Sequence, residues 1–332
     1  MGITLPWPAS SSSSGSASAS AGVTSGRPRP GEPGPSSPGR RLKLVVAYDG
    51  AGLRGFALQP GQRTVAGELS GVIERVAGHA AKLVCAGRTD AGVHAWGQVV
   101  HVDLDPGIDP VRLQRACNRI LSPSIVVRAA EVAPCGFDAR RQAVSRCYRY
   151  QVLNTPLPDP FLAGVAWHVP EPLDLRAMQA ATDPLLGEHD FSAFCRRPKQ
   201  KDAGEPAAAE PAAVEPAAAG PAAAGPAAAE PAIRPPPSLV RRVLRASWSD
   251  AGSPDAGEPD AGQPDAGRLL CFTVEANAFC HQMVRSMVGM LVSVGRGQLR
   301  AGEVAALLRS GDRGLVPSPA PAHGLCLWAV RY

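Results

Sequence analysis

The sequence of 332 residues lacks the features that mark zinc-binding, secreted and membrane-spanning proteins. Its eight cysteines are scattered and form no C-x-x-C pair, so the usual spacing of zinc ligands is missing. The N-terminus lacks the charged start and apolar core of a signal peptide, and no apolar run is long enough to cross a bilayer. We therefore expect no metal, no membrane association, reduced thiols and a cytoplasmic location. A mitochondrial leader fits less well, because the N-terminal tail is too rich in proline to form an amphipathic helix.

Three segments also lack the large apolar side chains that a folded core requires. Residues 1–39 are rich in Ser, Gly and Pro, residues 202–237 alternate short alanine runs with proline, and residues 250–267 repeat Asp-Ala-Gly. Such compositions cannot offset the conformational entropy lost on ordering. They predict a disordered tail and two low-complexity inserts in an otherwise globular body.

That body is strongly basic. The whole chain carries a formal charge of +5, of which the tail contributes +1 and the two inserts −4 and −5, so the remainder carries +13. A basic body with acidic loops suits a polyanionic partner, although charge alone is a modest argument for nucleic acid.

Hydrophobic periodicity in the body predicts an α+β fold. The first half, 40–145, follows a strand-helix-strand-strand-helix-strand order, which favours helices packed on one face of an antiparallel sheet. The second half is 146–332, interrupted by the two inserts. Strands are predicted over 42–48, 82–85, 98–102, 125–131, 146–153, 240–248, 269–275 and 325–332, and helices over 64–80, 111–120, 175–186, 279–294 and 301–309.

The most distinctive string is AGRTDAGVHA, residues 86–95. It places Arg88 and Asp90 on a tight loop, where Gly87 and Gly92 allow backbone angles and close approaches that a side chain would block. An isolated Asp in such a loop most often caps a turn, and an Arg two residues away is as often a structural ion-pair partner as a functional group. The spacing alone therefore leaves a structural role and a functional role open.

The string closely resembles the signature of the tRNA pseudouridine synthase A family, and further matches follow in family order from about residue 41 to the C-terminus. The matching segments are LKLVVAYDG (42–50), QRTV (62–65), FDARRQAVSRCYRY (137–150), GEHDFSAF (187–194), EANAFCHQMVRSMV (275–288) and the last residues, 323–332. The resemblance implies two related α+β halves whose antiparallel sheets join across a central basic cleft, with helices on one face.

It also implies the chemistry. Isomerising uridine to pseudouridine requires detaching the base from C1′ through N1, rotating it and reattaching it through C5, which needs no cofactor, metal or redox change. The family's catalytic roles fall on four residues here: Asp90 as nucleophile, Arg88 in base flipping, Tyr148 in stacking on the uracil, and Arg285 as the ion-pair partner of Asp90. The implied partners are tRNA and a second copy in a homodimer, and the implied target is a uridine of the anticodon stem-loop, tRNA positions 38–40.

Three further residues are candidates for RNA binding. Arg140 and Arg146 lie in an arginine-rich segment, where some side chains contact phosphate and others form a solvated face, and the sequence does not separate the two. His281 falls one helical turn before Arg285, although a lone histidine is more often structural. Tyr150 shares a strand face with Tyr148 and is expected to belong to the core.

The sequence departs from the family after Gly50. The family pattern Gly-Trp-Gln is replaced by Gly55, Phe56 and Ala57, which leaves open the same chemistry at another tRNA or RNA position. An RNA-binding module with little catalysis is a further alternative, and the presence of all four catalytic residues argues against it.

Overall fold

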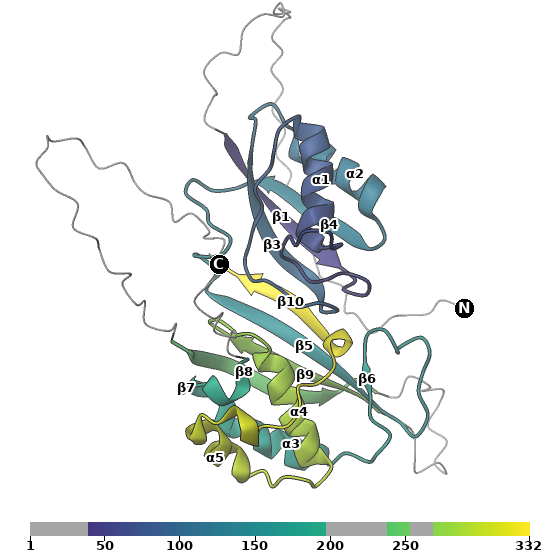
Figure 1. The fold of residues 1–332 in the computed structure, drawn as a ribbon, viewed down its shortest axis with the longest axis vertical. Helices are drawn as coiled ribbons and strands as arrows, with labels where there is room; N and C mark the ends of the chain where they lie inside the picture. The colour runs from purple at the N-terminus through teal and green to yellow at the C-terminus, as the bar shows by residue number, and fades with distance from the viewer. Residues whose placement is uncertain (1–38, 197–237, 253–267) are drawn as a thin grey trace, which may run out of the picture.

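The computed structural model describes residues 39–196, 238–252 and 268–332, which form one large mixed β-sheet with helices (Figure 1). The α+β class is confirmed. The predicted tail, apart from Gly39, and most of the two inserts lie outside the described residues. The strands are β1 (Arg40–Tyr48), β2 (Val84–Cys85), β3 (His94–Leu104), β4 (Ile125–Val132), β5 (Ser145–Asn154), β6 (Trp167–His168), β7 (Gly187–Asp190), β8 (Val240–Asp250), β9 (Arg268–Ala276) and β10 (Leu325–Arg331). The helices are α1 (Val65–Ala77), α2 (Pro110–Leu121), α3 (Leu175–Thr182), α4 (Met283–Gly295) and α5 (Glu303–Ser310).

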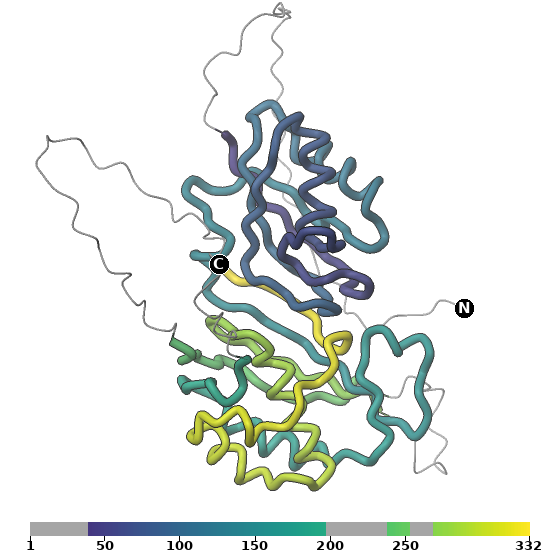
Figure 2. Tube along the Cα trace, viewed as in Figure 1, coloured from purple at the N-terminus to yellow at the C-terminus, as the bar shows by residue number. Residues whose placement is uncertain are grey.

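The sheet has the strand order β4-β1-β3-β10-β5-β9-β8-β7, with β2 paired to β3 and β6 paired to β5. The prediction of purely antiparallel sheets is wrong at the centre, because β10 runs parallel to β3 and antiparallel to β5. The last strand of the chain therefore joins the two parts of the sheet, as the yellow segment between the blue β3 and the teal β5 shows (Figure 2).

The helix starts in the first part of the chain follow from their capping residues. The Thr64 side chain accepts a hydrogen bond from the backbone N–H of Gly67 at the start of α1, a capping role that threonine favours. The Asp109 carboxylate accepts from two backbone N–H groups at the start of α2, where Pro110 takes the first helical position. Both caps fix the register of the apolar faces that pack against the sheet.

The start of α4 differs from the prediction. The helix begins at Met283 rather than Phe279, because Gln282 adopts a left-handed backbone conformation with φ of 62°. A non-glycine residue in this region interrupts a right-handed helix. Phe279, Cys280 and His281 consequently lie on a loop that leads into the helix.

The core lies against one face of the sheet. Leu44 and Val46 of β1, Tyr150 of β5 and Phe272 of β9 belong to one buried cluster, together with apolar side chains of α1 and α4. Alternate residues of a strand share a face, so this cluster defines the side of the sheet that the helices cover (Figure 1). The prediction that Tyr150 is a core residue is confirmed, since its ring is fully buried and its hydroxyl donates to the carbonyl of Pro321 at 2.8 Å.

The prediction of reduced cysteines is wrong for one pair. Cys195 and Cys280 form a disulfide with their Cα atoms 5.8 Å apart, whereas the other six cysteines are free. The two residues are 85 positions apart in the chain, so only the fold brings them together. In the described ranges, no helix is both long and apolar enough to cross a membrane.

Candidate active site

The loop that carries Arg88 and Asp90 connects β2 to β3 and packs against an earlier loop of the chain. The backbone N–H of Phe56 donates to the carbonyl of Thr89 at 3.0 Å, and that of Gly92 donates to Leu53 at 3.3 Å. Arg88 and Asp90 are therefore presented from a loop fixed by its backbone, as the sequence predicts.

This contact requires a glycine on the facing loop. Gly55 has φ of +89°, and a Cβ atom there would lie 2.8 Å from the carbonyl oxygen of Thr89. A side chain at this position would meet backbone that cannot move independently of Asp90. Residues 55–57 are the segment that differs from the family pattern, and its glycine, Gly55, is a structural requirement of the Asp90 loop.

A buried hydrogen-bond network holds the loop from the other side. The hydroxyl of Tyr48 lies 2.8 Å from that of Thr89, and the amide of Gln98 donates to the carbonyl of Gly87 at 2.7 Å and to Tyr48 at 3.4 Å. Thr89 and Gln98 are buried. The residues on each side of Arg88 are therefore fixed, which leaves its exposed side chain on a rigid base.

The side chains of His281 and Arg285 approach the Asp90 carboxylate, one toward each oxygen. His281 Nε2 lies 3.4 Å from Oδ1, and Arg285 Nη1 lies 4.0 Å from Oδ2. The Asp90 side chain keeps 32% of its surface exposed and that of Arg285 only 17%. The carboxylate therefore has a neighbour at each oxygen and is still open to a substrate.

The backbone also fixes the direction of the Arg285 guanidinium. Its Nε donates to the carbonyl of Ala320 at 2.7 Å, and the N–H of Ala320 donates back to the carbonyl of Arg285 at 2.9 Å. One edge of the guanidinium is thus used for positioning, and the other faces Asp90.

Tyr148 lies on the helix-covered side of β5 and is 8% exposed. Its ring meets that of Phe279 edge-on, with the centroids 5.0 Å apart. Burial raises the pKa of its hydroxyl, and the nearby negative charge of Asp90 raises it further, so the hydroxyl stays protonated at neutral pH.

The three candidate RNA-binding residues have different surroundings. Arg140 is exposed, and His281 is about half-exposed beside Asp90. Arg146 donates four hydrogen bonds to the backbone carbonyls of Ala86, Arg140, Ala143 and Asn277. Burial lowers the pKa of its guanidinium. These bonds give Arg146 a positioning role beside the Asp90 loop.

Known proteins match nearly the whole described body. Residues 229–332 match a family model described as tRNA pseudouridine synthase. The chain is 38% identical, over 88% of its length and 89% of the relative, to tRNA pseudouridine synthase A of Frankia casuarinae. It is 37% identical over 88% of its length and 96% of the relative to that of Methylobacterium nodulans, and 34% identical over 88% of its length and all of the relative to that of Brevibacillus brevis.

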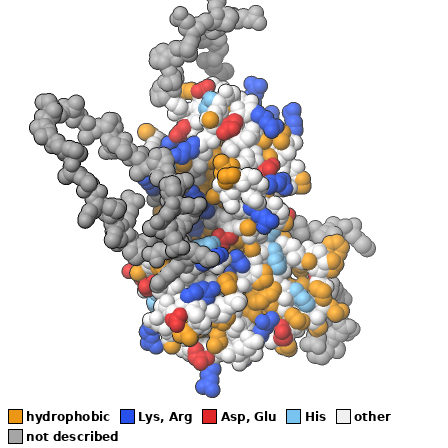
Figure 3. Space-filling model, viewed as in Figure 1, with side chains coloured by type: hydrophobic (Ala, Val, Ile, Leu, Met, Phe, Trp, Pro, Cys, Tyr) orange, Lys and Arg blue, Asp and Glu red, His pale blue; other side chains and the backbone are white. Residues whose placement is uncertain are grey.

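The chain belongs to the tRNA pseudouridine synthase A family. The resemblance seen in AGRTDAGVHA is confirmed, and membership makes the chain an enzyme of the isomerase class. On the viewed face of this synthase, Lys and Arg side chains lie over both its upper and its lower part (Figure 3).

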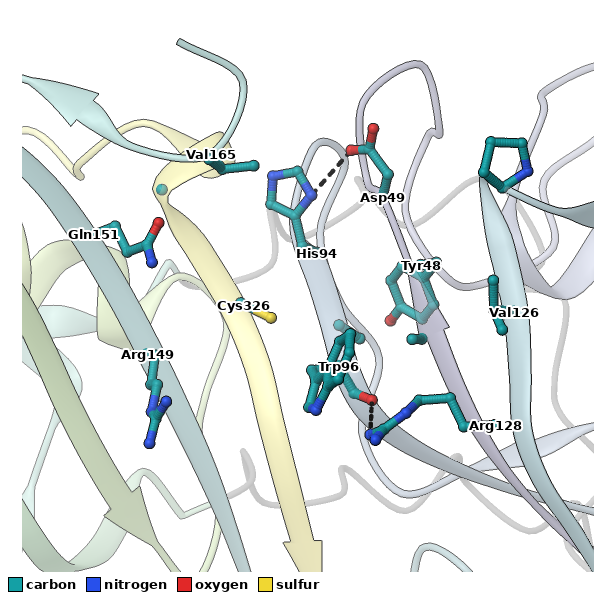
Figure 4. A pocket seen from close by; sticks show the side chains of 14 residues that line it. Tyr48, Asp49, His94, Trp96, Val126, Arg128, Arg149, Gln151, Val165 and Cys326 are labelled. Atoms are coloured by element: carbon teal, nitrogen blue, oxygen red, sulfur yellow. Dashed lines mark hydrogen bonds and ion pairs between the residues drawn. The ribbon is translucent and has the colours of Figure 1, made fainter. Parts of the chain in front are cut away.

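Two cavities lie in the synthase outside the immediate surroundings of Asp90. One, of about 680 Å³, adjoins the loop before α4 and is lined by Cys195, Arg196, Gln282 and Arg313 among others. The second, of about 350 Å³, lies over the end of β1, the start of β3 and the middle of β5 and is lined by Trp96, Arg128, Arg149 and neighbouring residues (Figure 4). None of Asp90, Tyr148 and Arg285 lines either cavity. Within the described ranges, no three His, Cys, Asp or Glu side chains converge as a metal site.

Sequence reasoning about the synthase missed the residues that support the catalytic loop and the ring of Tyr148. The sequence pattern predicts only that Tyr48 and Gln98 belong to strands and that Phe279 belongs to a helix. A usable signal was the polar Gln98 at the start of an apolar strand, since a buried amide requires hydrogen-bond partners.

Proposed function

We propose that this enzyme isomerises uridine to pseudouridine in the anticodon stem-loop of tRNA, at positions 38–40, with Asp90 as the nucleophile. The observation that carries the proposal is the Asp90 carboxylate on its rigid loop, with His281 and Arg285 at its two oxygens. The printed names of the relatives, tRNA pseudouridine synthase A, support tRNA as the substrate.

The reaction conserves atoms and electrons. The Asp90 carboxylate forms a covalent bond with the sugar or with the activated uracil ring, and this bond breaks again before product leaves. The C1′–N1 bond is lost, the C1′–C5 bond forms, the proton on C5 is released and N1 gains one. Because substrate and product are isomers, the step requires no cofactor.

The neighbours of Asp90 divide the remaining tasks. Arg285 and His281 hold the carboxylate aimed at the flipped nucleotide. Arg88 enters the space that the base leaves, because its exposed side chain projects from a fixed loop. Tyr148 supports the uracil ring by stacking, which is favourable for any base.

The positive charge of the body attracts the negatively charged tRNA backbone. Arg140 and His281 border the site and contact the tRNA backbone, and Arg146 keeps the Asp90 loop in place for them. The two predicted halves, 40–145 and 146–332, face a central basic cleft on the helix-covered side. We propose that the enzyme works in the cytoplasm as a homodimer, as the family resemblance implies; light scattering on the purified chain tests the dimer.

One observation bears on the alternative target. Phe56, which replaces the family's aromatic residue, is buried and packs against Tyr48 with the ring centroids 6.4 Å apart. It therefore supports the catalytic loop rather than RNA, and Ala57 is the remaining change that favours another position.

The test is incubation of the purified chain with unmodified tRNA and no added cofactor, followed by base-resolved mapping of pseudouridine. The proposal predicts signal in the anticodon stem-loop that disappears in Asp90→Ala. Signal elsewhere supports the alternative target. No signal from the native chain, with tRNA still bound, supports the RNA-binding module instead.

A further inference from the structure

We propose that the Cys195–Cys280 disulfide is a reversible latch that holds two residues of the active site in position. The inference rests on the proposed roles of Asp90 and Tyr148. Cys280 is flanked by the two side chains of its loop that reach the site: Phe279, whose ring meets Tyr148, and His281, whose imidazole meets Asp90. The bond to Cys195 therefore anchors the loop midway between its two functional contacts.

A backbone hydrogen bond reinforces the same connection. The N–H of Arg196 donates to the carbonyl of His281 at 3.0 Å, so the pairs 195–196 and 280–281 are linked once through sulfur and once through the backbone. The next residue, Gln282, has φ of 62°, a conformation that is unfavourable for a residue other than glycine. A segment with this backbone angle requires external support, and the disulfide supplies a covalent one.

The environment of the disulfide favours a bond that forms and breaks with the redox state of its surroundings. Disulfides in reducing compartments are usually transient, and catalytic or redox-sensing. Cys195 is only 1% exposed, whereas Cys280 is partly exposed. A small thiol therefore reaches Cys280 first, and Cys195 acts as the resolving residue.

The oxidant that closes the latch is a low-molecular-weight disulfide such as oxidised glutathione. The Cys280 thiolate attacks one of its sulfurs and releases one thiol. The Cys195 thiolate then attacks Cys280 and releases the second. Two protein thiols are oxidised, one small disulfide is reduced to two thiols, and the two protons pass to the leaving thiolates.

The latch predicts a higher turnover in the oxidised enzyme. With the bond closed, His281 and Phe279 keep their distances to Asp90 and Tyr148. With the bond open, the loop samples other positions, and we expect kcat to fall about fivefold with little change in KM, because placement of catalytic groups is lost rather than tRNA affinity.

The experiment equilibrates the full chain in buffers of stepped reduced-to-oxidised glutathione ratio. Mass spectrometry of unreduced peptides gives the fraction of Cys195–Cys280 crosslink, and pseudouridine formation on unmodified tRNA gives kcat and KM in the same samples. We expect kcat to follow the crosslinked fraction. Cys280→Ser should stay at the reduced level in every buffer, and Cys135→Ser, which alters an exposed free cysteine, should respond as the native chain does.

Hydrogen exchange over residues 277–286 supplies a readout that is independent of activity. The latch predicts slower exchange in the crosslinked state. Absence of the crosslink under oxidised glutathione, equal kcat in both states, faster turnover in the reduced state, or equal exchange would each overturn the proposal. If neither state makes pseudouridine, the proposed function fails, while the crosslink and exchange measurements still decide whether the latch exists.

Discussion

The chemistry proposed for Asp90 depends on residues that are themselves held by the backbone. Arg285 is the clearest case, because the carbonyl of Ala320 fixes one edge of its guanidinium 2.7 Å away and turns the other toward the carboxylate. An arginine with 17% of its surface exposed has lost much of its hydration, so its charge acts on Asp90 more strongly than a surface charge would.

We predict that Arg285→Gln lowers kcat by at least about tenfold and leaves tRNA affinity nearly unchanged. The substitution removes a positive charge beside the nucleophile rather than one that contacts the RNA. Single-turnover rates and filter binding measure the two quantities. Arg296→Gln is the matched control, since Arg296 lies at the other end of α4 and pairs with Glu171 at 2.9 Å. Equal losses in both variants would show that the effect is structural.

The sequence predicted individual residues unevenly. The family resemblance implied that Arg285 partners Asp90, and the structure brings the two side chains within 4.0 Å. The Tyr48–Thr89–Gln98 network was not predicted, because an alternating apolar pattern shows that a strand exists but not which polar side chains its neighbours satisfy.

At the scale of elements, the loop of residues 50–56 acts as a template for the catalytic loop. Gly55→Ala places a methyl group 2.8 Å from the carbonyl of Thr89 at φ of +89°, so we predict lower thermal stability and a loss of activity. Gly71→Ala in α1 has no neighbour within 4 Å and should instead stabilise by about 0.5–1 kcal/mol. Thermal unfolding and turnover on tRNA check both, and an active, stable Gly55→Ala variant would contradict the template role.

A hydrogen bond from the loop after β4 to a buried histidine makes the stability of the protein depend on pH. His101 of β3 is buried, and its Nδ1 accepts a hydrogen bond from the N–H of Ala139 at 3.0 Å, a bond that requires an unprotonated nitrogen. Burial, aided by the charge of Arg41, lowers the pKa of His101 below 6.5. The unfolded chain then binds the proton at a higher pH than the folded chain, so the free energy of unfolding falls as pH drops below about 6.5.

We expect the melting temperature of the native chain to fall more between pH 7.5 and 5.5 than that of His101→Asn, which cannot be protonated in this range. Scanning calorimetry at the two pH values measures the difference. Parallel decreases in the two proteins would exclude His101 as the source.

Most elements were predictable because capping and periodicity are local. Thr64 at the start of α1 and the alternation of β5 are examples. The start of α4 was not, because the apolar spacing continues through Phe279 while the left-handed angle at Gln282 ends the helix. A periodic pattern gives the spacing of apolar residues and carries no information on such a backbone angle.

At the scale of the whole molecule, the position of β10 was the main feature missed. The sequence placed a strand at 325–332, but only the fold inserts it between β3 and β5, parallel to one and antiparallel to the other. The loop carrying Asp90 precedes β3 and Tyr148 lies on β5, so the last strand of the chain sets the distance between them.

The long Ala- and Pro-rich segment belongs to the residues that the structure does not describe, and the chain on both sides of it is tied to the body. The N–H of Arg196 bonds to His281, and that of Phe191 bonds to Leu239. We predict that deleting residues 204–234 leaves turnover within about twofold of the native chain. Loss of tRNA binding on this deletion, measured against the undeleted chain, would show that the segment contributes to recognition.

The most direct test of the central claim compares Asp90→Asn with the native chain in single-turnover assays on unmodified tRNA. Asparagine keeps the size of the side chain but cannot act as a carboxylate nucleophile. The account predicts tRNA affinity within about threefold of native and a rate reduced by at least about a thousandfold. A variant that still forms pseudouridine at a rate near that of the native chain would contradict the assignment of Asp90 as the nucleophile.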